Sequence, residues 1–496
     1  MSNSSPRAKL MYPGNEPSRT KIVATVGPSS DSEEMLADLV RAGVDVFRLN
    51  MAHGTTDVSQ ARLERIRKVS GELEIPIGIL ADLAGPKMRL GAIPGDSYDC
   101  DPATPIRFVH GETTTEPNAF TTTYDPLIDD VHPGDKIMLA DGTVVCEVVS
   151  KTENAVLCNV IQGGTVRSRQ GVNLPGSKLS IKTLQPADIE NAKWAVAAGV
   201  DFLGLSFVRS PDDIRELREI LQEAAWPDKP VPHIIAKIEK PEAVANLDHI
   251  VAAADAIMVA RGDLGVETDI AKIAVVQKQI ISACRRKNKP VIVATQMLES
   301  MHTESMPTRA EATDVANAIL DGTDACMLSG ETAVGEHPVL AVEMMHRIAI
   351  ETERLVYARL LEDAGHRYLK LARNGRKKAS LPESAAEAAV YLSDVSGAKA
   401  VFAVTESGKT ILLLSKIRHA AMTIGCSTNE VALRRMCLYW GVIPTRLNAS
   451  TPRSMLEEVL QRGRNDGFFK KGERIVLLSD PSNGTENRRL FYVHEI

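Results

Sequence analysis

The 496-residue sequence is poor in aromatic residues, carries a small net negative charge and contains no long apolar run. Aromatic residues make up 4% of it, and the formal net charge is -6 at pH 7. Such a chain offers few platforms for stacking bases and does not attract a phosphate backbone. A membrane-spanning helix needs a run of about 18 apolar residues, which is also missing. We therefore expect no nucleic-acid partner and no membrane insertion.

Cysteine pairs with metal-ligand or redox spacing are absent as well. The seven cysteines are odd in number and include no C-x-x-C pair. They indicate reduced, mostly structural thiols. The stretch that precedes Thr20 has no continuous apolar segment followed by a small-residue cleavage site, so it does not resemble a secretion signal. We expect an N-terminal tail over residues 1–18 and a cytoplasmic protein.

What the sequence does have is a regular alternation of apolar, β-branched runs with helical patterns, from Thr20 onward. With 44% hydrophobic and 25% charged residues, the composition is that of a globular protein. Alternation of this kind is typical of βα units around a parallel sheet. Eight runs are found, at residues 20–27, 44–50, 76–82, 202–208, 233–239, 256–263, 290–296 and 325–331.

Eight near-continuous apolar strands separated by helices favour a (β/α)₈ TIM barrel over an open doubly wound sheet. Between the third and fourth runs, short alternating segments rich in Gly, Pro, Asp and Thr predict a small inserted β-barrel that serves as a lid. After a helix expected from Pro338 to about Glu362, further strands and helices predict a C-terminal α/β domain. The predicted domains are the barrel at 19–86 and 179–357, the lid at 87–178 and the C-terminal domain at 358–496.

Polar residues follow the predicted strands where each one ends. In (β/α)₈ barrels, the active site lies at the carboxyl ends of the strands, so we expect these side chains to meet at one mouth. They are Arg48, Asn50, Asp82, Ser206, Lys237, Glu239, Arg261, Asp263, Thr295, Ser329 and Glu331.

Three charged residues on two neighbouring strands stand out. Lys237 and Glu239 are two positions apart, so strand alternation points both to the same side. They form either a structural ion pair or a phosphate-binding cation beside a metal-binding carboxylate. Asp263 follows Gly262 on the next strand, in a segment that is either a plain turn or part of the site. Two carboxylates from adjacent strands suit Mg²⁺.

Several stretches resemble the pyruvate kinase family, and the resemblance extends from Thr20 to about Pro444. It implies an enzyme that transfers the phosphoryl group of phosphoenolpyruvate to ADP, giving pyruvate and ATP in glycolysis. Mg²⁺ is the implied metal, with Mn²⁺ as an alternative. The stretches that carry the resemblance are TKIVATVGPSS, FRLNMAHG, GPKMR, GVNLPG, AKIEKPEA, MVARGDLG, ATQMLESM and MLSGETAVG.

The resemblance also assigns roles in metal and phosphoryl binding. Glu239 and Asp263 would hold Mg²⁺, and Lys237 would stabilise the phosphoryl group during transfer. Arg48 would contact the phosphate with a forked geometry that Lys cannot reproduce. A loose phosphoryl-transfer transition state needs positioning and positive charge more than covalent chemistry.

For the remaining substrate groups, the resemblance implies that the backbone amides of Gly262 and Asp263, together with Thr295, bind the carboxylate. Thr295 and Ser329 would lie near the water chain that protonates the enolate. The alternative for both hydroxyls is a plain hydrogen bond to nearby backbone.

The nucleotide would contact three further residues, again by resemblance. They are Asn50, His53 and Arg89. The inserted domain would close over the nucleotide and exclude water.

The sequence departs from the family where many members bind K⁺. Asn50 and Asp82 of this monovalent-cation region remain, but the expected serine, threonine and acidic residue are Ala52, Leu83 and Lys87. A unit charge at about 4 Å is worth about 4 kcal/mol at an effective dielectric of 20. A tethered Lys ammonium can therefore replace the ion, and we expect that K⁺ is not required. The alternative is that Lys87 points to solvent.

The segment TESGKT resembles the loop that binds phosphorylated effectors in regulated members of the family. Hydroxyls, a glycine and backbone amides suit phosphate, although Glu406 adds a negative charge. The residues of this candidate effector loop are Thr405, Ser407, Gly408 and Thr410.

Residues 309–322 carry an apolar face that lies at a subunit contact in the family, which implies a homotetramer. The alternative is that this face packs on the barrel. Two other functions compete with the kinase: a barrel lyase or aldolase acting on a pyruvate enolate, and a noncatalytic nucleotide or sugar-phosphate sensor. The lyase does not explain the insert or the C-terminal domain. The sensor predicts loss of Lys237, Glu239, Asp263 or Thr295, and all four are present.

Overall fold

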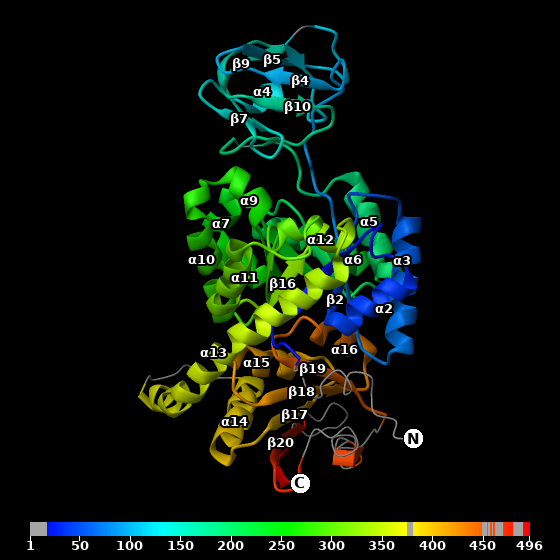
Figure 1. Cartoon of the computed structure of the whole chain (residues 1–496), viewed down its shortest axis with the longest axis vertical. Helices are drawn as coiled ribbons and strands as arrows, with labels where there is room; N and C mark the ends of the chain where they lie inside the picture. The colour runs from blue at the N-terminus through cyan, green and yellow to red at the C-terminus, as the bar shows by residue number, and fades with distance from the viewer. Residues whose placement is uncertain are drawn as a thin grey trace.

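The computed structural model places an inserted β domain at one end of a barrel and an α/β domain at the other (Figure 1). Residues 1–16 of the predicted tail lie outside the described residues. The described residues are 17–373 except 117, 178, 226 and 228, then 380–448, 454, 457, 458, 460, 461, 470–479 and 490–496.

The eight predicted parallel strands close into a barrel in the order β1-β16-β15-β14-β13-β12-β3-β2. This confirms the (β/α)₈ prediction. Nearly every residue of these strands is buried, because one face packs inside the barrel and the other against the helices. The strands are β1 (Lys21–Val26), β2 (Val46–Asn50), β3 (Gly78–Asp82), β12 (Phe202–Leu205), β13 (His233–Ile238), β14 (Ala256–Ala260), β15 (Val291–Ala294) and β16 (Ala325–Leu328).

The helices around the barrel begin and end at residues that suit those positions. Ser32 caps the first of them by accepting a hydrogen bond from Met35 N, and Gly43 ends it with a φ of 124°. The helices are α2 (Glu33–Ala42), α3 (Thr56–Glu72), α5 (Pro186–Ala198), α6 (Pro211–Ala224), α7 (Pro241–Ala245), α8 (Leu247–Ala253), α9 (Arg261–Glu267), α10 (Ile273–Arg286), α11 (Arg309–Asp321), α12 (Gly330–Ala333) and α13 (Pro338–Arg373), with short 3₁₀ turns η1 (Ile270–Lys272) and η2 (Glu299–His302).

The inserted domain leaves the barrel after β3 and returns before α5. Its strands form a six-stranded sheet, β11-β7-β8-β9-β5-β6, and a two-stranded sheet, β10-β4, around a separate apolar core. Its elements are β4 (Ser97–Cys100), β5 (Pro105–Val109), β6 (Ala119–Phe120), α4 (Leu127–Asp130), β7 (Lys136–Leu139), β8 (Val144–Lys151), β9 (Ala155–Gln162), β10 (Gly164–Arg167) and β11 (Val172–Asn173).

The C-terminal domain holds a five-stranded sheet, β19-β18-β17-β20-β21, in which only β21 is antiparallel to its neighbour. Its elements are α14 (Leu381–Ser396), β17 (Ala400–Val404), α15 (Lys409–Ile417), β18 (Met422–Ser427), α16 (Glu430–Met436), β19 (Val442–Arg446), β20 (Arg474–Ser479) and β21 (Leu490–Glu495). The α/β prediction is confirmed. Helix α13 is longer than expected: it runs to Arg373 instead of about Glu362, because good helix formers dominate this stretch.

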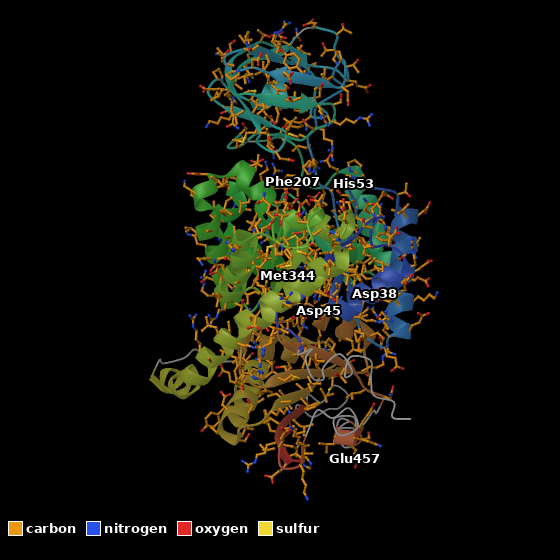
Figure 2. All side chains as sticks on the ribbon, in the orientation of Figure 1. Asp38, Asp45, His53, Phe207, Met344 and Glu457 are labelled. Atoms are coloured by element: carbon orange, nitrogen blue, oxygen red, sulfur yellow. The ribbon has the colours of Figure 1, made fainter. Side chains whose placement is uncertain are left out.

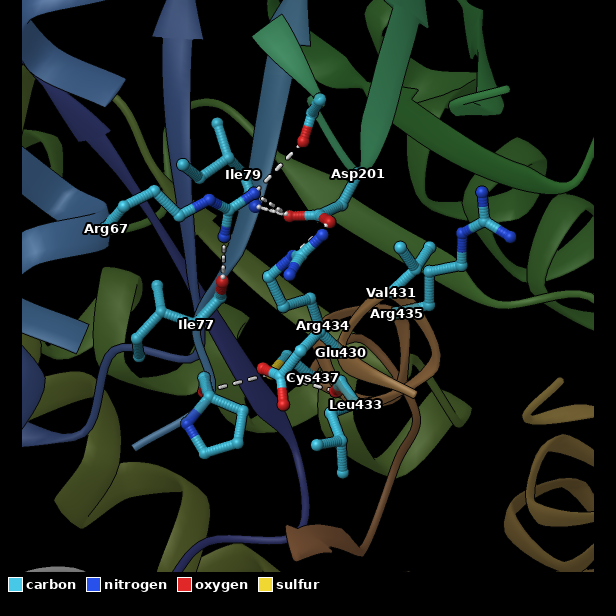
Figure 3. Close-up of polar contacts among 12 residues, drawn as sticks. Arg67, Ile77, Ile79, Asp201, Glu430, Val431, Leu433, Arg434, Arg435 and Cys437 are labelled. Atoms are coloured by element: carbon cyan, nitrogen blue, oxygen red, sulfur yellow. Dashed lines mark hydrogen bonds and ion pairs between the residues drawn. The ribbon is translucent and has the colours of Figure 1, made fainter. Parts of the chain in front are cut away.

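Buried ion pairs join the C-terminal domain to the amino ends of the barrel strands. Arg67 from α3 and Arg434 from α16 both donate to Asp201, at 2.7 Å each, and Ile79 N donates to the same carboxylate at 2.9 Å (Figure 3). On the opposite side of the barrel, before β16, Lys416 and Arg418 pair with Asp324. The carboxyl ends of the strands are therefore left to face the inserted domain.

Two expectations about the surface and the thiols can be compared with the structure. All seven cysteines are free and buried, as their spacing predicted. Among the helices in the described part of the chain, none is both long and apolar enough to cross a bilayer.

Candidate active site

The polar residues at the carboxyl ends of the barrel strands meet beneath the inserted domain. Phe207 and His53 lie at this end of the barrel (Figure 2). Between the mouth and the insert is a pocket whose lining includes Lys87, Phe207, Lys240 and Asp263.

Lys237 lies at the centre of the site, near three oxygen-bearing side chains. Its Nζ donates to Ser206 Oγ at 2.8 Å and lies 2.9 Å from Glu239 Oε1 and 3.4 Å from Asp82 Oδ2. Arg48 Nε donates to the same Asp82 oxygen at 2.8 Å. The structure thus brings together five predicted residues from the ends of strands β2, β3, β12 and β13, and two of their side chains are cations that alternate with two carboxylates.

Burial and charge compete in setting the protonation of this cluster. Burial alone would lower the pKa of Lys237, but Asp82 and Glu239 outweigh it and raise that pKa. Burial alone would raise the pKa of Asp82, but Lys237 and Arg48 outweigh it and lower that pKa. Burial raises the pKa of Glu239; Lys237 opposes the increase, and Asp263 adds to it. Lys237 is therefore charged at neutral pH, while ionised Glu239 lacks full compensation.

The carboxylate pair fits a divalent cation. Glu239 Oε2 accepts from Phe207 N at 2.7 Å, and the buried Oε1 is paired with the Lys237 ammonium at 2.9 Å but has no aligned hydrogen-bond donor among the described residues. Asp263 lies close enough to raise the pKa of Glu239. No group of three or more His, Cys, Asp or Glu side chains in the described part of the chain is arranged for a metal. A bound ion would therefore complete its shell with substrate and water oxygens, as Mg²⁺ prefers.

Thr295 is held in an uncommon backbone conformation beside Gly262. Its φ is 65° and that of Gln296 is 54°, both in the left-handed region that non-glycine residues rarely adopt. Gly262 N donates to Thr295 Oγ1 at 2.7 Å, and this hydroxyl donates to Ala294 O at 2.6 Å. The Gly262 amide, which the resemblance assigns to substrate, thus donates to Thr295 Oγ1.

Arg261 fixes this strained turn, a role that the sequence did not reveal. Its guanidinium donates to Thr295 O at 2.9 Å and Gln296 O at 3.0 Å, and it pairs with Asp314 Oδ2 at 2.6 Å. The side chain is buried, at 7% exposure. The contacts join positions far apart in the chain, so only the high density of polar residues at strand ends could have pointed to Arg261.

Ser329 follows the last barrel strand, at the mouth. Its amide donates to Glu331 Oε2 at 2.7 Å, and Leu298 N donates to the other oxygen of that carboxylate at 3.1 Å. Ser329 Oγ is buried, and no described residue forms a hydrogen bond with it. The predicted alternative of a plain backbone hydrogen bond is therefore not what the structure shows for this hydroxyl.

In the described part of the chain, the side chains assigned to the nucleotide form no hydrogen bond or ion pair with the cluster around Lys237. Asn50 Oδ1 accepts from Ala52 N at 3.1 Å, and His53 is exposed. Arg89 belongs to the inserted domain, where its guanidinium donates to Arg169 O at 3.1 Å. These groups surround the mouth without forming one cluster.

The monovalent-cation region divides between the core and the hinge. Asp82 belongs to the central cluster, and Leu83 is buried with its carbonyl oxygen accepting from Ser206 Oγ at 2.7 Å. Lys87 is exposed and lines the pocket between barrel and insert.

The candidate effector loop lies in the C-terminal domain, beyond the opposite end of the barrel. Thr405 and Thr410 are buried, and Thr405 Oγ1 accepts from Gly408 N at 3.0 Å. Ser407 is exposed. Of the three hydroxyls in the predicted loop, only that of Ser407 therefore belongs to an exposed residue.

Fold and site together define an enzyme of the (β/α)₈-barrel class, with a cationic centre that suits an anionic substrate and a carboxylate pair that suits a metal. Comparisons with known proteins narrow this class. Residues 17–342 match the family model "Pyruvate kinase, barrel domain", and residues 383–489 match "Pyruvate kinase, alpha/beta domain".

Relatives with known names agree with these family models. The chain is 40% identical to a pyruvate kinase of Mycobacterium intracellulare over 96% of its own length and 98% of the relative. It is 38% identical to one of Bacillus licheniformis, over 96% and 80%. The crystal structure of a pyruvate kinase from Cryptosporidium parvum matches with a TM-score of 0.89 at 32% identity, covering 96% of each chain. The chain belongs to the pyruvate kinase family.

Proposed function

We propose that the protein transfers the phosphoryl group of phosphoenolpyruvate to ADP, giving pyruvate and ATP, as a Mg²⁺-dependent enzyme of glycolysis in the cytoplasm. The observation that carries the proposal is Lys237, a buried ammonium between Glu239 and Asp82 at the mouth of the barrel. Lys237 and Arg48 provide positive charge for an anionic group, and Glu239 beside Asp263 suits the metal that would accompany it.

Positioning of the phosphoryl group would fall to Lys237 and Arg48. Arg48 is held by Asp82 and by Thr25 Oγ1 at 3.1 Å, so its fork is oriented before substrate arrives. Lys237 would stabilise charge on the phosphoryl oxygens during transfer. A Mg²⁺ ion held by Glu239 and Asp263, or Mn²⁺ in its place, would supply further positive charge at the enolate and carboxylate oxygens.

The carboxylate of the substrate would lie over the turn that Arg261 fixes. Thr295 and the amides of Gly262 and Asp263 would bind it, with Thr295 Oγ1 exchanging its present partner for the substrate. Ser329 would serve the protonation of the enolate. The nucleotide would lie toward Asn50, His53 and Arg89, and closure of the insert would exclude water from the transfer.

The activity is tested by following pyruvate formation from phosphoenolpyruvate, ADP and Mg²⁺, with EDTA as the matched control. We expect turnover that EDTA abolishes and that Mn²⁺ restores. Cleavage of a pyruvate-containing substrate without ADP would instead favour the lyase or aldolase. Absence of turnover with saturating nucleotide and sugar phosphates would favour the sensor.

Independence from K⁺ is proposed from Lys87 in the hinge between barrel and insert. The pocket that Lys87 lines also includes Asp263, so a rotation of the exposed lysine can bring its ammonium toward the site. Turnover in tetramethylammonium buffer should equal that in K⁺ buffer. The substitution Lys87→Glu should make the enzyme K⁺-dependent, whereas turnover that needs K⁺ in the unmodified protein would exclude the idea.

A homotetramer is also proposed. Apolar side chains are exposed before and on α11, with Met306 at 60% and Leu320 at 38%, and after α12, with Val334 at 56%. Burial in a subunit contact would remove them from water. Light scattering on the purified protein gives the mass of the assembly and so tests the homotetramer.

Binding of a phosphorylated effector is proposed at Thr405, Ser407, Gly408 and Thr410. Sugar phosphates or AMP added to the kinetic assay test this proposal.

A further inference from the structure

The inserted domain contacts the barrel through a polar cluster that lies apart from the one around Lys237. The edge of the insert that carries β7 lies over α9 (Figure 1). Asn173, on β11 beside β7, donates from Nδ2 to Glu267 Oε1 at 3.1 Å. Lys240 Nζ donates to the same oxygen at 2.6 Å. The barrel therefore supplies both charges of this contact, and the insert supplies the amide.

Both charges of the contact are buried. The side chain of Lys240 is 7% exposed and that of Glu267 is 1% exposed. Two charges lose hydration when they are buried, and their attraction often repays only part of that loss, so such a pair is weak evidence for stability. Its best-attested use is to fix how parts of a protein meet. An insert that two linkers join to a barrel is a part that needs such a contact.

The two linkers are held at their barrel ends. On the outgoing linker, Gly85 N donates to Asp188 Oδ1 at 3.2 Å. On the returning linker, Arg209 donates to Leu179 O at 2.9 Å and to Ile181 O at 2.7 Å. A pivot of the insert would therefore act beyond these points, on the side where the buried carboxylate binds the amide of β11.

The same edge of the insert carries Arg89, which the resemblance assigns to the nucleotide. Arg89 forms an antiparallel β-bridge with Gly171. Next to this bridge, Val172 N donates to Met88 O at 3.0 Å. Asn173 follows directly along the chain, two residues after Gly171. The point at which Asn173 meets the barrel therefore determines where Arg89 lies relative to the barrel.

We propose that Glu267 docks the insert through Asn173 and thereby places Arg89 for the nucleotide, an inference that rests on the proposed function. Glu267 is a positioning residue, held by Lys240, and contacts no reacting atom. Release of the contact would leave the barrel residues in place and would move Arg89. The apparent affinity for ADP then falls with the fraction of molecules in which the insert is docked. Binding of phosphoenolpyruvate, which depends on barrel residues, does not change.

Substitutions of Asn173 test the contact and leave the buried ion pair intact. Asn173→Ala removes the donor, and Asn173→Asp places a second carboxylate beside Glu267. Asn154→Ala and Asn154→Asp, at an exposed asparagine of the insert, are the matched controls. Docking is measured without substrates, as hydrogen–deuterium exchange of the linker amides at 84–88 and 174–177 followed by mass spectrometry. The two sides of the site are measured separately, as the KM for ADP and the KM for phosphoenolpyruvate.

We expect Asn173→Asp to raise the KM for ADP about tenfold, because repulsion replaces a hydrogen bond to a charged group. Asn173→Ala should raise it about threefold, since the donor is lost without repulsion. In both variants the linker amides should exchange faster than in the parent, while the KM for phosphoenolpyruvate remains unchanged. The substitutions at Asn154 should change none of these quantities.

A double variant tests the pairing itself. Asn173→Asp combined with Glu267→Gln exchanges the amide and the carboxylate between the two positions, so that one can again donate to the other. We expect this double variant to recover most of the affinity for ADP and most of the linker protection that Asn173→Asp loses. A merely structural role of either residue predicts that the second substitution adds to the damage.

Three results would overturn the inference: a parental KM for ADP with parental linker exchange in Asn173→Asp, an equal rise of both KM values in that variant, and no recovery in the double variant. Failure of the proposed function would look different, because the unmodified protein would then form no pyruvate from phosphoenolpyruvate and ADP. The role toward the nucleotide would fall with it, and linker exchange would still show whether Glu267 docks the insert.

Discussion

The two ends of the barrel treat buried charge in opposite ways. At the amino ends, Asp201 is matched by two arginines and a backbone amide, and Asp324 by a lysine, an arginine and Val291 N. At the carboxyl ends, Glu239 Oε1 and Asp82 Oδ1 are buried and have no aligned hydrogen-bond donor among the described residues. Both oxygens of Asp201 are therefore bound, whereas Asp82 and Glu239, although paired with Arg48 and Lys237, each keep one oxygen without an aligned hydrogen bond.

This difference between the two ends of the barrel separates carboxylates that stabilise the fold from carboxylates that can bind a ligand. A carboxylate whose partners are all supplied by the protein fixes the C-terminal domain to the barrel and has nothing left to bind. A carboxylate whose partners are incomplete costs stability in the free protein and gains from a ligand. Substitutions at the two ends should therefore have opposite consequences for rate and stability.

The largest effect is expected from Lys237→Met at the carboxyl end. Loss of the central ammonium should lower kcat by about 10³-fold, or about 4 kcal/mol, because charge developing on the phosphoryl group is no longer stabilised. The matched control is Lys21→Met, which removes a buried lysine paired with Asp45 at 3.1 Å at the amino end. It should lower stability and leave kcat unchanged. Steady-state kinetics that show Lys237→Met within tenfold of the parent would contradict the comparison.

At the amino end, Asp201→Asn should destabilise without loss of activity. Two arginines would then face a neutral group, which costs about 3 kcal/mol in the free energy of unfolding. Urea unfolding measures the loss, and kcat/KM at low temperature should be that of the parent. Asp38→Asn is the control, since the Asp38–Arg41 pair is about half exposed and should contribute less than about 0.5 kcal/mol. If Asp201→Asn and Asp38→Asn lowered the free energy of unfolding equally, the buried ion pairs at the amino end would not have the stabilising role proposed for them.

The variant Glu239→Gln should sharpen the comparison through Mg²⁺ and pH. At 100 times its Kd, Mg²⁺ should stabilise the parent by about 2.7 kcal/mol and the variant by much less. In EDTA, without Mg²⁺, the variant should instead be more stable than the parent. Because the folded protein raises the pKa of Glu239, its ionisation disfavours folding above that pKa, and this cost vanishes as the pH falls below the ordinary value.

Thermal unfolding at several pH values between 4 and 8, with and without Mg²⁺, tests both parts of this expectation. The variant in EDTA should be more stable than the parent at the upper pH values and should lose that advantage at the lower ones. A variant that Mg²⁺ stabilises as much as the parent would show that Glu239 does not hold the ion.

The smallest effect is expected from Arg261→Lys, which retains the positive charge but loses the forked guanidinium group. A single ammonium cannot serve both carbonyls and Asp314, so the turn at Thr295 and Gln296 should relax from its positive φ values. We expect kcat to fall about tenfold, or about 1.4 kcal/mol. Arg286→Lys, at an exposed arginine of α10, is the control for the chemical change itself. If Arg261→Lys and Arg286→Lys had the same kcat, Arg261 would have no role in the active site.

Much of this architecture could be read from the sequence, since strands buried on both faces are continuous apolar runs. All eight barrel strands were predicted for that reason, and the polar residues at their ends marked Arg48, Lys237 and Glu239. Strand β19 was not predicted, because Pro444 within it argues against a strand.

The missed parts of the site depend on contacts that no local pattern encodes. The link from Arg261 to Asp314 spans 53 positions, and that from Arg48 to Asp82 spans 34. Asp82 was predicted at the mouth of the barrel and in the K⁺ region, but its pairing with Lys237, which also contacts Glu239, was not predicted. The positive φ of Thr295 gave no sign in the sequence, because threonine does not favour that conformation.

The pairing of β3 with β12 has a consequence for how the chain folds. Leu80 lies beside Phe202 in the barrel, although the whole inserted domain separates them in sequence. Closing a loop costs more entropy the longer and looser it is. An insert that folds first around its own core brings its two ends together and shortens the effective loop. We infer that the inserted domain acts during folding as an internal brace for the β3–β12 pairing, so that damage to the core of the insert would delay this pairing.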